Sequence, residues 1–320
     1  MRVTLVVNPF ASSVTPKAQA RTMEALTADH ELTLVETTCR DHATTLAGQA
    51  AAGGAEVVVV LGGDGTLNEV ANGLVGSDTA LAALPGGSTN VFARTIGVPN
   101  NLGQALAQLR QSLDAGSIRR MPLGVVNGRR FLFHIGLGFD AAVVEQVERR
   151  AALKRKVGQA IFVYATMATL ARHFDRKRSH FSMRLGDGTT VDGSYAVVMN
   201  SNPYTYLGRI PLDLTDDAVP GRGLVAVTVK SLALPTVLGL ITSAMGNGTR
   251  LRKNPQVDHR PDLWSFTVTG NPGPFPYQVD GDYLGMVDEL KVGYEPHALA
   301  IVAPPTVARR NRSASPPPRE

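Results

Sequence analysis

Short apolar runs alternate with longer amphipathic stretches along the first third of the chain. Residues 57–61 are five consecutive apolar residues, which is typical of a strand buried on both faces of a parallel sheet. Further strands are predicted at residues 2–7, 31–36 and 81–84. Helices are predicted between them, at residues 16–28, 42–52, 66–74 and 91–94. This alternation predicts an α/β domain with right-handed crossovers over residues 1–122.

The pattern changes after residue 120, where β-rich segments follow one another. Strands are predicted at residues 131–136, 184–185, 195–200, 224–229, 264–269 and 289–294. One helical block, residues 154–174, interrupts them. This predicts an antiparallel β-sandwich domain over residues 123–295. A last strand at 298–302, within residues 296–304, is expected to rejoin the first domain, and the Pro/Arg-rich residues 305–320 are expected to be a disordered tail.

Composition narrows the class of protein. A chain of 320 residues with 43% hydrophobic residues fits two globular domains and excludes general disorder. The single cysteine, Cys39, excludes an intrachain disulfide and a cysteine-based zinc site. The apolar run at the N-terminus is short and ends at Asn8-Pro9, unlike a signal peptide. No stretch reaches the roughly 18–20 apolar residues of a membrane span, so we expect a cytoplasmic chain.

The first glycine loop follows the predicted strand at residues 57–61. It reads Gly62-Gly63-Asp64-Gly65-Thr66 and opens a predicted helix. Glycines allow close backbone approach, and a helix N-terminus offers unpaired N–H groups, which together favour phosphate binding. An acidic Asp64 in such a loop fits a Mg²⁺ ligand, or alternatively a tight turn in which the carboxylate caps backbone N–H groups. The loop is neither a Walker loop nor a dinucleotide fingerprint.

A second loop repeats this design 24 residues later. After the predicted strand at 81–84 come Gly86, Gly87, Ser88, Thr89 and Asn90, and then another helix. Loops after neighbouring parallel strands lie at the same edge of the sheet, where ligands bind in open α/β folds. Strand 2–7 ends at that same edge. Its end carries Asn8-Pro9 and, further on, Ser12, which are expected to contact a nucleotide or to form a simple Asn-Pro turn.

Five sequence elements occur in a characteristic order. They are Asn8-Pro9, residues 62–69 (GGDGTLNE), residues 85–90 (PGGSTN), residues 136–141 (GLGFDA) and residues 280–282 (DGD). In this order the chain resembles the soluble diacylglycerol kinase and sphingosine kinase family of lipid kinases, most closely the bacterial type. The resemblance extends to about Pro304. It implies an α/β ATP-binding domain, a β-sandwich domain that receives the lipid, and transfer of the ATP γ-phosphate to a lipid hydroxyl with Mg²⁺.

The resemblance also assigns roles to residues of this chain. It implies that Asp280 is the general base and that Asp64 is a second catalytic residue. It implies a catalytic Mg²⁺ near Asp64, Asp140 and Asp282. Thr37, or its neighbour Thr38, occupies the position of a nucleotide-contacting threonine. The candidate ATP contacts are Asn8, Pro9, Ser12, Thr37, Gly62, Gly63, Asp64, Gly65, Thr66, Leu67, Asn68, Glu69, Gly86, Gly87, Ser88, Thr89 and Asn90.

Two departures from the family pattern are visible. Val91 stands where relatives commonly have an Asp. The segment Val219 to Val225 lacks the acidic residues with which relatives hold a structural Mg²⁺ in the second domain, although Asp216 and Asp217 precede it. Asp216 and Asp217 are alternative ligands for that structural Mg²⁺, which the resemblance alone leaves in doubt. Asp280-Gly281 by itself also fits a plain hairpin turn.

Charge is concentrated in one segment. The net charge is +5, and residues 149–178 contain nine basic residues and one acidic residue, Asp175. We expect this segment to attract anionic lipid at the inner face of the membrane, and we expect no nucleic-acid binding. Three functions remain open: a kinase for diacylglycerol or a related lipid, an NAD-kinase-like small-molecule kinase, and a catalytically silent nucleotide or lipid sensor. The acceptor and the oligomeric state are left open.

Overall fold

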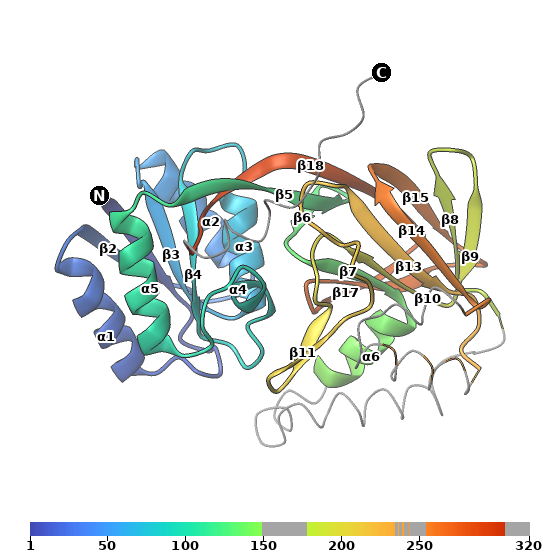
Figure 1. The fold of residues 1–320 in the computed structure, drawn as a ribbon, viewed down its shortest axis with the longest axis horizontal. Helices are drawn as coiled ribbons and strands as arrows, with labels where there is room; N and C mark the ends of the chain where they lie inside the picture. The colour runs from blue at the N-terminus through green and yellow to red at the C-terminus, as the bar shows by residue number, and fades with distance from the viewer. Residues whose placement is uncertain (149–177, 234–235, 237–238, 240–242, 244–253, 305–320) are drawn as a thin grey trace. The chain divides into compact units, whose positions relative to one another are not determined.

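The chain folds into two compact units in the computed structural model, which describes residues 1–148, 178–233, 236, 239, 243 and 254–304 (Figure 1). The N-terminal unit contains Met1–Arg120 and the segment that starts at Leu299, and the C-terminal unit contains Met121–Ala298. The boundary expected after residue 122 thus lies after Arg120, and the chain returns at Leu299 rather than at residue 296. The tail at 305–320 and the helical block predicted at 154–174 lie outside the described residues.

The N-terminal unit is built on a parallel sheet. Its strands lie in the order β2-β1-β3-β4-β18, where β18 contributes only its last residues. Their bounds are β1 (Arg2–Val7), β2 (Glu31–Glu36), β3 (Val57–Gly62), β4 (Ala80–Pro85) and β18 (Glu289–Val302). All residues of β3 and β4 are buried, as their continuous apolar sequences predict. The predicted α/β fold is confirmed.

Helices cover both faces of this sheet (Figure 1). They are α1 (Pro16–Thr27), α2 (His42–Ala52), α3 (Asp64–Leu74), α4 (Val91–Thr95) and α5 (Leu102–Asp114). Side chains of α1 and α5 pack on one face, in a core that includes Leu5, Val59 and Leu109. On the other face α2 and α3 lie close together, and a Cβ at Gly73 would lie only 2.3 Å from the backbone oxygen of Thr44. Among these five helices, only α5 has no counterpart in the sequence predictions.

The C-terminal unit is an antiparallel β-sandwich. One sheet has the order β14-β13-β10-β7-β16-β17, and the other contains β18-β15-β8-β9. Both sheets contribute side chains to one buried core, for example Leu137 and Phe275 from the first and Phe181 and Val268 from the second. The bounds are β7 (His134–Gly138), β8 (Phe181–Leu185), β9 (Thr190–Gly193), β10 (Tyr195–Met199), β13 (Leu224–Val229), β14 (Val257–Leu263), β15 (Ser265–Gly270), β16 (Phe275–Val279) and β17 (Asp282–Val287). The predicted antiparallel domain is confirmed.

Several predicted strand boundaries differ from the structure, and the differences are largest in two places. The strand predicted at 131–136 is divided between β6 (Arg129–Phe131), which pairs with β5 (Ile118–Val126), and β7. The break at Leu132 and Phe133 has a physical cause, because their N–H groups bind a side chain instead of a neighbouring strand. The strands predicted at 289–294 and 298–302 are a single strand, β18, whose first part pairs with β15 and whose last part pairs with β4.

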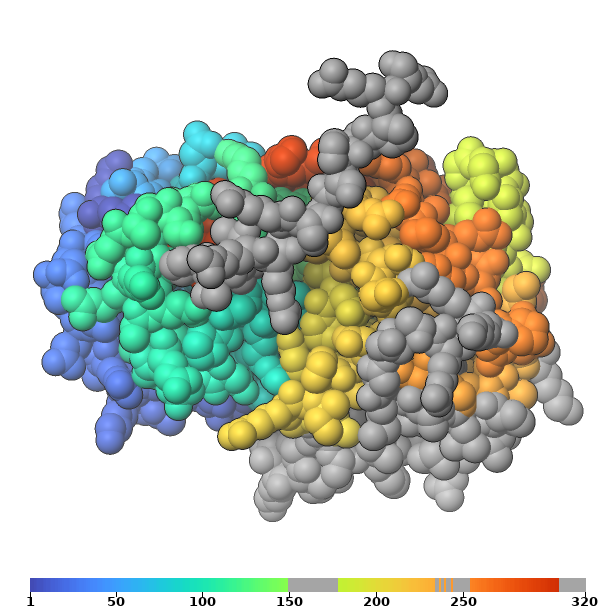
Figure 2. All heavy atoms as spheres, in the orientation of Figure 1, coloured from blue at the N-terminus to red at the C-terminus, as the bar shows by residue number. Residues whose placement is uncertain are grey.

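Three smaller elements also belong to the described part of the C-terminal unit. Helix α6 (Phe139–Glu148) follows β7 directly. A hairpin of β11 (Thr205–Leu207) and β12 (Ile210–Leu212) forms a separate two-stranded sheet. Figure 2 shows this hairpin, in yellow, projecting from the surface of its unit. Within the described part of the chain, no helix is long and apolar enough to cross a membrane.

Candidate active site

The two predicted glycine loops lie against each other. Strands β3 and β4 are adjacent and parallel, and Gly62 is the register partner of Pro85. The N–H of Gly86 donates to the backbone oxygen of Gly62 at 2.9 Å. A Cβ at Gly86 would lie 2.7 Å from the nitrogen of Gly62, and a Cβ at Gly87 would lie 2.9 Å from the Cα of Gly63. Glycine is therefore required here because two backbones are in contact.

The segment after β1 joins this edge, as the sequence predicts. Asn8 donates from Nδ2 to Oγ1 of Thr66 at 2.9 Å and accepts the N–H of Phe10. Ser13 binds the second loop, because its N–H donates to the backbone oxygen of Gly86 and its Oγ donates to that of Gly87. The side-chain amide of Asn8 thus ties the end of β1 to α3. Pro9 and Ser12 are exposed beside these contacts.

Asp64 holds the two loops together. Its Oδ2 accepts the N–H of Val91 and its Oδ1 accepts the N–H of Phe92, both at 3.0 Å. These are the first N–H groups of α4, whose N-cap residue, Asn90, makes no side-chain cap of its own. Asp64 therefore caps a helix that belongs to the second loop. This is the capping alternative that the sequence left open beside a Mg²⁺ role.

Asn90 shapes the second loop from within. It is 3% exposed and adopts a left-handed backbone conformation with φ of 54°. Its Oδ1 accepts the N–H of Gly87 at 2.8 Å, and its Nδ2 donates to the Gly87 oxygen and to Oδ1 of Asn100. Asn90 thus fixes the loop conformation, while Ser88 at the loop tip is exposed.

Several other predicted ATP contacts have structural partners. One carboxylate oxygen of Glu69 accepts the N–H of Ala43 at 3.1 Å and so caps the start of α2. Asn68 and Leu67 are buried in α3. Thr37 is also buried, and its N–H extends the β1 pairing by donating to the oxygen of Val7. The partly buried Gly63 and Gly65 and the start of α3 therefore remain the part of the first loop that offers an anion-binding surface.

Asp280, the predicted general base, lies in the C-terminal unit. Val279 ends β16 and pairs with Asp282 at the start of β17, so Asp280 and Gly281 are the two residues of a tight hairpin turn. Both have positive φ, 48° and 86°. Two left-handed residues of the Asp-Gly type are characteristic of a type I′ hairpin turn. The turn alternative is thus confirmed, but it does not exclude catalysis.

Asp280 is held by a cradle of backbone N–H groups. Its Oδ2 accepts the N–H of Leu132 at 2.7 Å, and its Oδ1 accepts those of Phe133 and His134 at 3.0 and 3.1 Å. The cradle is itself fixed from behind by Asn200, whose Nδ2 donates to the oxygen of Leu132 and whose N–H donates to that of Phe133. Sequence reasoning did not identify the cradle, because backbone donors leave no residue-type signal.

The cradle is dry. Asp280 is 3% exposed, and His134 packs against Phe133 and Tyr204 with ring centroids 4.9 and 4.7 Å apart. Burial lowers the pKa of His134 to about 3, so its ring is neutral at physiological pH. The negative charge of Asp280 is therefore balanced by N–H dipoles and not by the adjacent imidazole.

Asp140, a predicted Mg²⁺ ligand, is 4% exposed at the start of α6. Its Oδ1 accepts the hydroxyl of Tyr204 at 2.7 Å, and its Oδ2 accepts Nε2 of Gln278 at 2.8 Å. Burial raises the pKa of Asp140, and the two hydrogen bonds act in the opposite direction. Both carboxylate oxygens are thus engaged by protein donors.

The acidic residues fit a Mg²⁺ site of one or two carboxylates that water and phosphates complete. No group of three His, Cys, Asp or Glu side chains arranged for a metal occurs in the described residues. Asp217 pairs with His259, whose Nε2 lies 3.4 Å from Oδ2 of Asp217. Mg²⁺ at nucleotide sites is commonly held by one or two carboxylates, water and the phosphates themselves. Asp64 beside the loops fits that donor set, whereas Asp140 is enclosed. Asp282 begins β17 and is partly buried.

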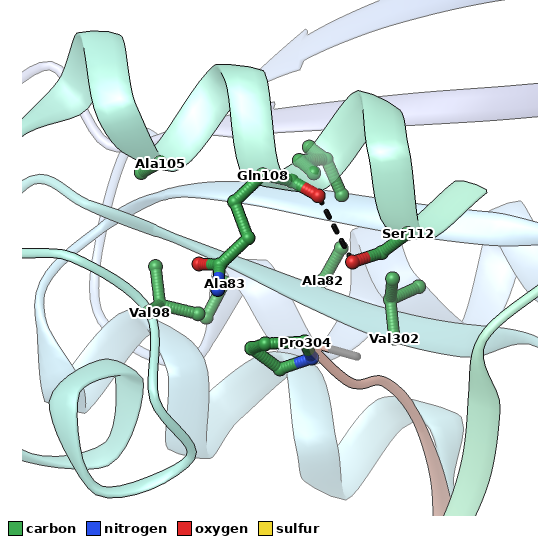
Figure 3. Close-up of a pocket in the computed structure, with 9 residues that line it drawn as sticks. Ala82, Ala83, Val98, Ala105, Gln108, Ser112, Val302 and Pro304 are labelled. Carbon is green, nitrogen blue, oxygen red and sulfur yellow. Dashed lines mark hydrogen bonds between the residues drawn. The ribbon is translucent and has the colours of Figure 1, made fainter. Parts of the chain in front are cut away.

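A small cavity lies elsewhere in the N-terminal unit (Figure 3). It is lined mainly by apolar residues of β4, α5 and the end of β18, among them Ala82, Val302 and Leu109. Gln108 points into it, and its Oε1 accepts no hydrogen bond from any described residue. None of the predicted site residues lines this cavity.

Comparison with known proteins identifies the N-terminal part. Residues 2–126 match the diacylglycerol kinase catalytic domain. A diacylglycerol kinase of Bacillus subtilis is 31% identical over 173 residues, which are 53% of this chain and 55% of that protein. An uncharacterized Synechocystis protein, sll0036, is 29% identical over 263 residues, 78% of this chain and 55% of that protein. The matches thus span about half the length of these curated relatives.

Solved structures share the fold of the whole chain. A diacylglycerol kinase structure from Bacillus anthracis has a TM-score of 0.69 at 19% identity and covers 96% of this chain and 98% of its own. An ATP-bound NAD kinase from Archaeoglobus fulgidus has a TM-score of 0.54 at 11% identity, covering 98% of this chain and 100% of its own. Residues 2–126 are therefore similar to the diacylglycerol kinase catalytic domain, and the chain as a whole shares the fold of diacylglycerol kinase structures.

Proposed function

We propose that this chain transfers the γ-phosphate of ATP to the hydroxyl of a lipid alcohol, with diacylglycerol as the first candidate and phosphatidic acid as its product. The observation that carries this proposal is the contact between the two glycine loops at the ends of β3 and β4. Gly63, Gly65 and Gly87 are only partly buried there, and the N-terminus of α3 lies at the same edge. Such a surface favours a polyphosphate.

The role of Asp280 in this proposal is to accept the proton of the lipid hydroxyl. Three N–H donors stabilise the charge of its carboxylate. A weak base is sufficient for phosphoryl transfer, because the transition state is loose and depends mainly on position. The rigid cradle favours that task, since an oriented carboxylate does not have to be ordered during the reaction.

Magnesium is also part of the proposal. When bound, Mg²⁺ would neutralise charge on the ATP phosphates. Asp64 is the residue that would hold it, directly or through water, because each of its oxygens retains a further lone pair beside the bond to α4. Asp282 is a second candidate ligand on the side of the lipid. The assignment of Asp140 as a ligand is weaker, because Asp140 is only 4% exposed whereas Asp64 is partly exposed.

The test is a transfer assay with γ-labelled ATP and Mg²⁺. The acceptors are diacylglycerol, monoacylglycerol, a sphingoid base, phosphatidylglycerol and a polyprenyl alcohol in mixed micelles, with NAD as a soluble acceptor. We expect label in one lipid, and none with Asp280→Asn. Label in NAD instead would support the NAD-kinase alternative, to which the fold similarity also points. ATP binding without any labelled product would contradict the proposal and favour a silent sensor.

We further propose that the basic segment at residues 149–178 brings the enzyme to anionic lipid at the cytoplasmic face of the membrane. Most of this segment lies outside the described residues, so its charge alone supports the proposal. Sedimentation with vesicles tests it. Binding is expected to rise with the fraction of phosphatidylserine and to fall with salt, and equal binding to pure phosphatidylcholine would contradict it.

A further inference from the structure

The turn that carries Asp280 needs external support. Asp280 has φ of 48°, in the left-handed region, which an aspartate tolerates less readily than a glycine. The first support is the bond from the Asp280 N–H to the backbone oxygen of His134 at 2.9 Å. The second is at Gly281, whose N–H donates to Oε1 of Gln278 at 2.8 Å. The conformation of the turn therefore depends on the orientation of the Gln278 amide.

Asp140 fixes that orientation. The other end of the amide, Nε2 of Gln278, donates to Oδ2 of Asp140 at 2.8 Å, and Gln278 is fully buried. The NH₂ end of the amide can only donate, so it needs an acceptor, and that acceptor is Oδ2 of Asp140. The oxygen of Gln278 is then directed to the Gly281 N–H. Tyr204 donates to the other oxygen of Asp140 and is the last member of this series of hydrogen bonds.

The backbone is shaped to admit this pair. Gly136 in β7 is the register partner of Gln278. A Cβ at Gly136 would lie 1.7 Å from Oδ2 of Asp140 and 2.5 Å from Nε2 of Gln278. The first glycine of the GLGFDA segment is therefore required because the carboxylate and the amide meet directly over its Cα. This requirement links two sequence elements, residues 136–141 and 280–282, that are far apart in the chain.

We propose that Asp140 and Gln278 are positioning residues, which hold the Asp280-Gly281 turn in its left-handed conformation through the hydrogen bonds from Gln278 Nε2 to Asp140 and from the Gly281 N–H to Gln278. This inference rests on the proposed role of Asp280. It replaces the Mg²⁺ role considered for Asp140, because the oxygen nearest the turn is used by the protein. Tyr204 supports the pair from the β11–β12 side, next to the exposed hairpin.

The test exchanges the donor and the acceptor of the pair. In Gln278→Glu, two carboxylates face each other and the pair repels. In Asp140→Asn combined with Gln278→Glu, the introduced asparagine donates to the introduced glutamate, which still accepts the Gly281 N–H, and the asparagine oxygen still accepts Tyr204. All three hydrogen bonds are thereby restored in an isosteric pair. Gln111→Glu, the same substitution at an exposed position of α5, is the matched control.

We expect Gln278→Glu to lower kcat by about 10- to 100-fold while the KM for ATP changes by less than about twofold, because the nucleotide loops belong to the other unit. The double variant should recover most of the lost kcat, and Gln111→Glu should match the wild type. Unchanged kcat in Gln278→Glu, or no recovery in the double variant, would overturn the proposal.

A second readout does not need activity. Amide hydrogen exchange of the Gly281 N–H, followed in a peptide over β16 and β17, should be slow in the wild type, faster in Gln278→Glu and slow again in the double variant. Equal exchange in all three would also overturn the proposal. If the wild type phosphorylates no lipid, the proposed function fails by itself, and the exchange data still decide whether the pair holds the turn.

Discussion

Asp64 in the N-terminal unit and Asp280 in the C-terminal unit are both bound by backbone N–H groups of a distant segment. Asp64 is partly buried and binds two N–H groups at the start of α4. Asp280 is almost fully buried, binds three N–H groups of residues 132–134, and lies in a left-handed turn that Gln278 supports.

Hydrogen bonds from backbone N–H groups to a carboxylate thus have a different structural role in the two places. The bonds of Asp64 join two loops in which Gly63, Gly65 and Gly87 are only partly buried. The bonds of Asp280 enclose the carboxylate in a preformed site. We infer that Asp64 builds a surface for a ligand, whereas Asp280 is itself the group that acts. Changes at Asp280 should therefore affect turnover, and changes around Asp64 should affect binding and stability.

The largest effect is expected for Asp280→Asn. An asparagine keeps the left-handed backbone but removes the proton acceptor, so kcat should fall by about 10³-fold while ATP binding persists. Steady-state transfer assays and ATP titrations measure the two effects. Asp288→Asn, in the exposed turn after β17, is the matched control and should be fully active. Loss of ATP binding in Asp280→Asn would contradict the separation of roles.

The next largest effect is expected for Gly86→Ala. The added Cβ would lie 2.7 Å from the nitrogen of Gly62, and because that atom is backbone, the two loops must separate. ATP affinity should fall by at least about tenfold, as a loop displacement of this kind commonly costs.

Gly48→Ala is the control for this substitution. A Cβ there would meet its nearest atom, the Gly73 oxygen, at an ordinary 3.7 Å, within α2. It should raise the free energy of unfolding by up to about 1 kcal/mol, the propensity difference in a helix interior, and leave ATP affinity unchanged. Equal ATP affinity in the two variants would show that the contact between loops is not needed for binding.

The third prediction concerns the pH dependence of the free energy of unfolding, and it applies to the C-terminal unit, which contains Asp280. His134 has a folded pKa of about 3, below its unfolded value of about 6.5. Between these values the unfolded chain binds a proton that the folded chain does not. The free energy of unfolding should therefore fall as the pH is lowered from about 6.5 toward 3, by up to about 1.4 kcal/mol per pH unit.

Trp264, the single tryptophan, reports unfolding of this unit by fluorescence in urea titrations. His134→Gln should be less stable than the wild type near neutral pH, because it loses the ring contacts, but its stability should depend less on acid. Parallel pH profiles of the two proteins would contradict the assignment. Asp140 acts in the opposite direction, since its raised pKa favours proton uptake by the folded chain, and it is present in both proteins.

The sequence predicted the parts of these sites that depend on residue type. The two glycine loops follow strands of continuous apolar residues, so their meeting at one sheet edge could be inferred before the register of Gly62 and Pro85 was known. The parallel sheet and the antiparallel sandwich followed from the same change in hydrophobic pattern. The predicted bounds of α2 and of β13 agree with the structure to the residue.

Partners that are distant in sequence could not be predicted. Glu69 and Asp64 fit phosphate or metal binding by their type, and only the structure shows that they cap α2 and α4. Asn200 lies in a predicted strand, and Gln278 lies in β16, which was not predicted from the sequence. Neither residue type indicated a role, because their function depends on which backbone groups they face. Helix α5 was overlooked, although Asn101 caps it through the N–H of Gln104.

The smallest effect, and the one that most sharpens the comparison, is expected for Asp64→Asn. The variant keeps the shape of the side chain but places an NH₂ group against one of the N–H groups of Val91 and Phe92 and removes a negative charge from the start of α4. The loss in stability should be about 1 kcal/mol, as for other helix caps. Hydrogen exchange over α4, without nucleotide, measures it.

The same variant distinguishes capping from metal binding. If Asp64 also holds Mg²⁺, the Mg²⁺ concentration that gives half-maximal activity should rise several-fold in Asp64→Asn, beyond the change in stability. Glu69→Gln is the matched control. Glu69 lies in α3, the helix that begins at Asp64, but the N–H group that it caps is at the start of α2. It should lose stability without a change in Mg²⁺ requirement. If both variants shift the Mg²⁺ requirement equally, Asp64 acts only as a cap, and the two acidic residues of the comparison then differ in kind: one builds the loop and the other takes the proton.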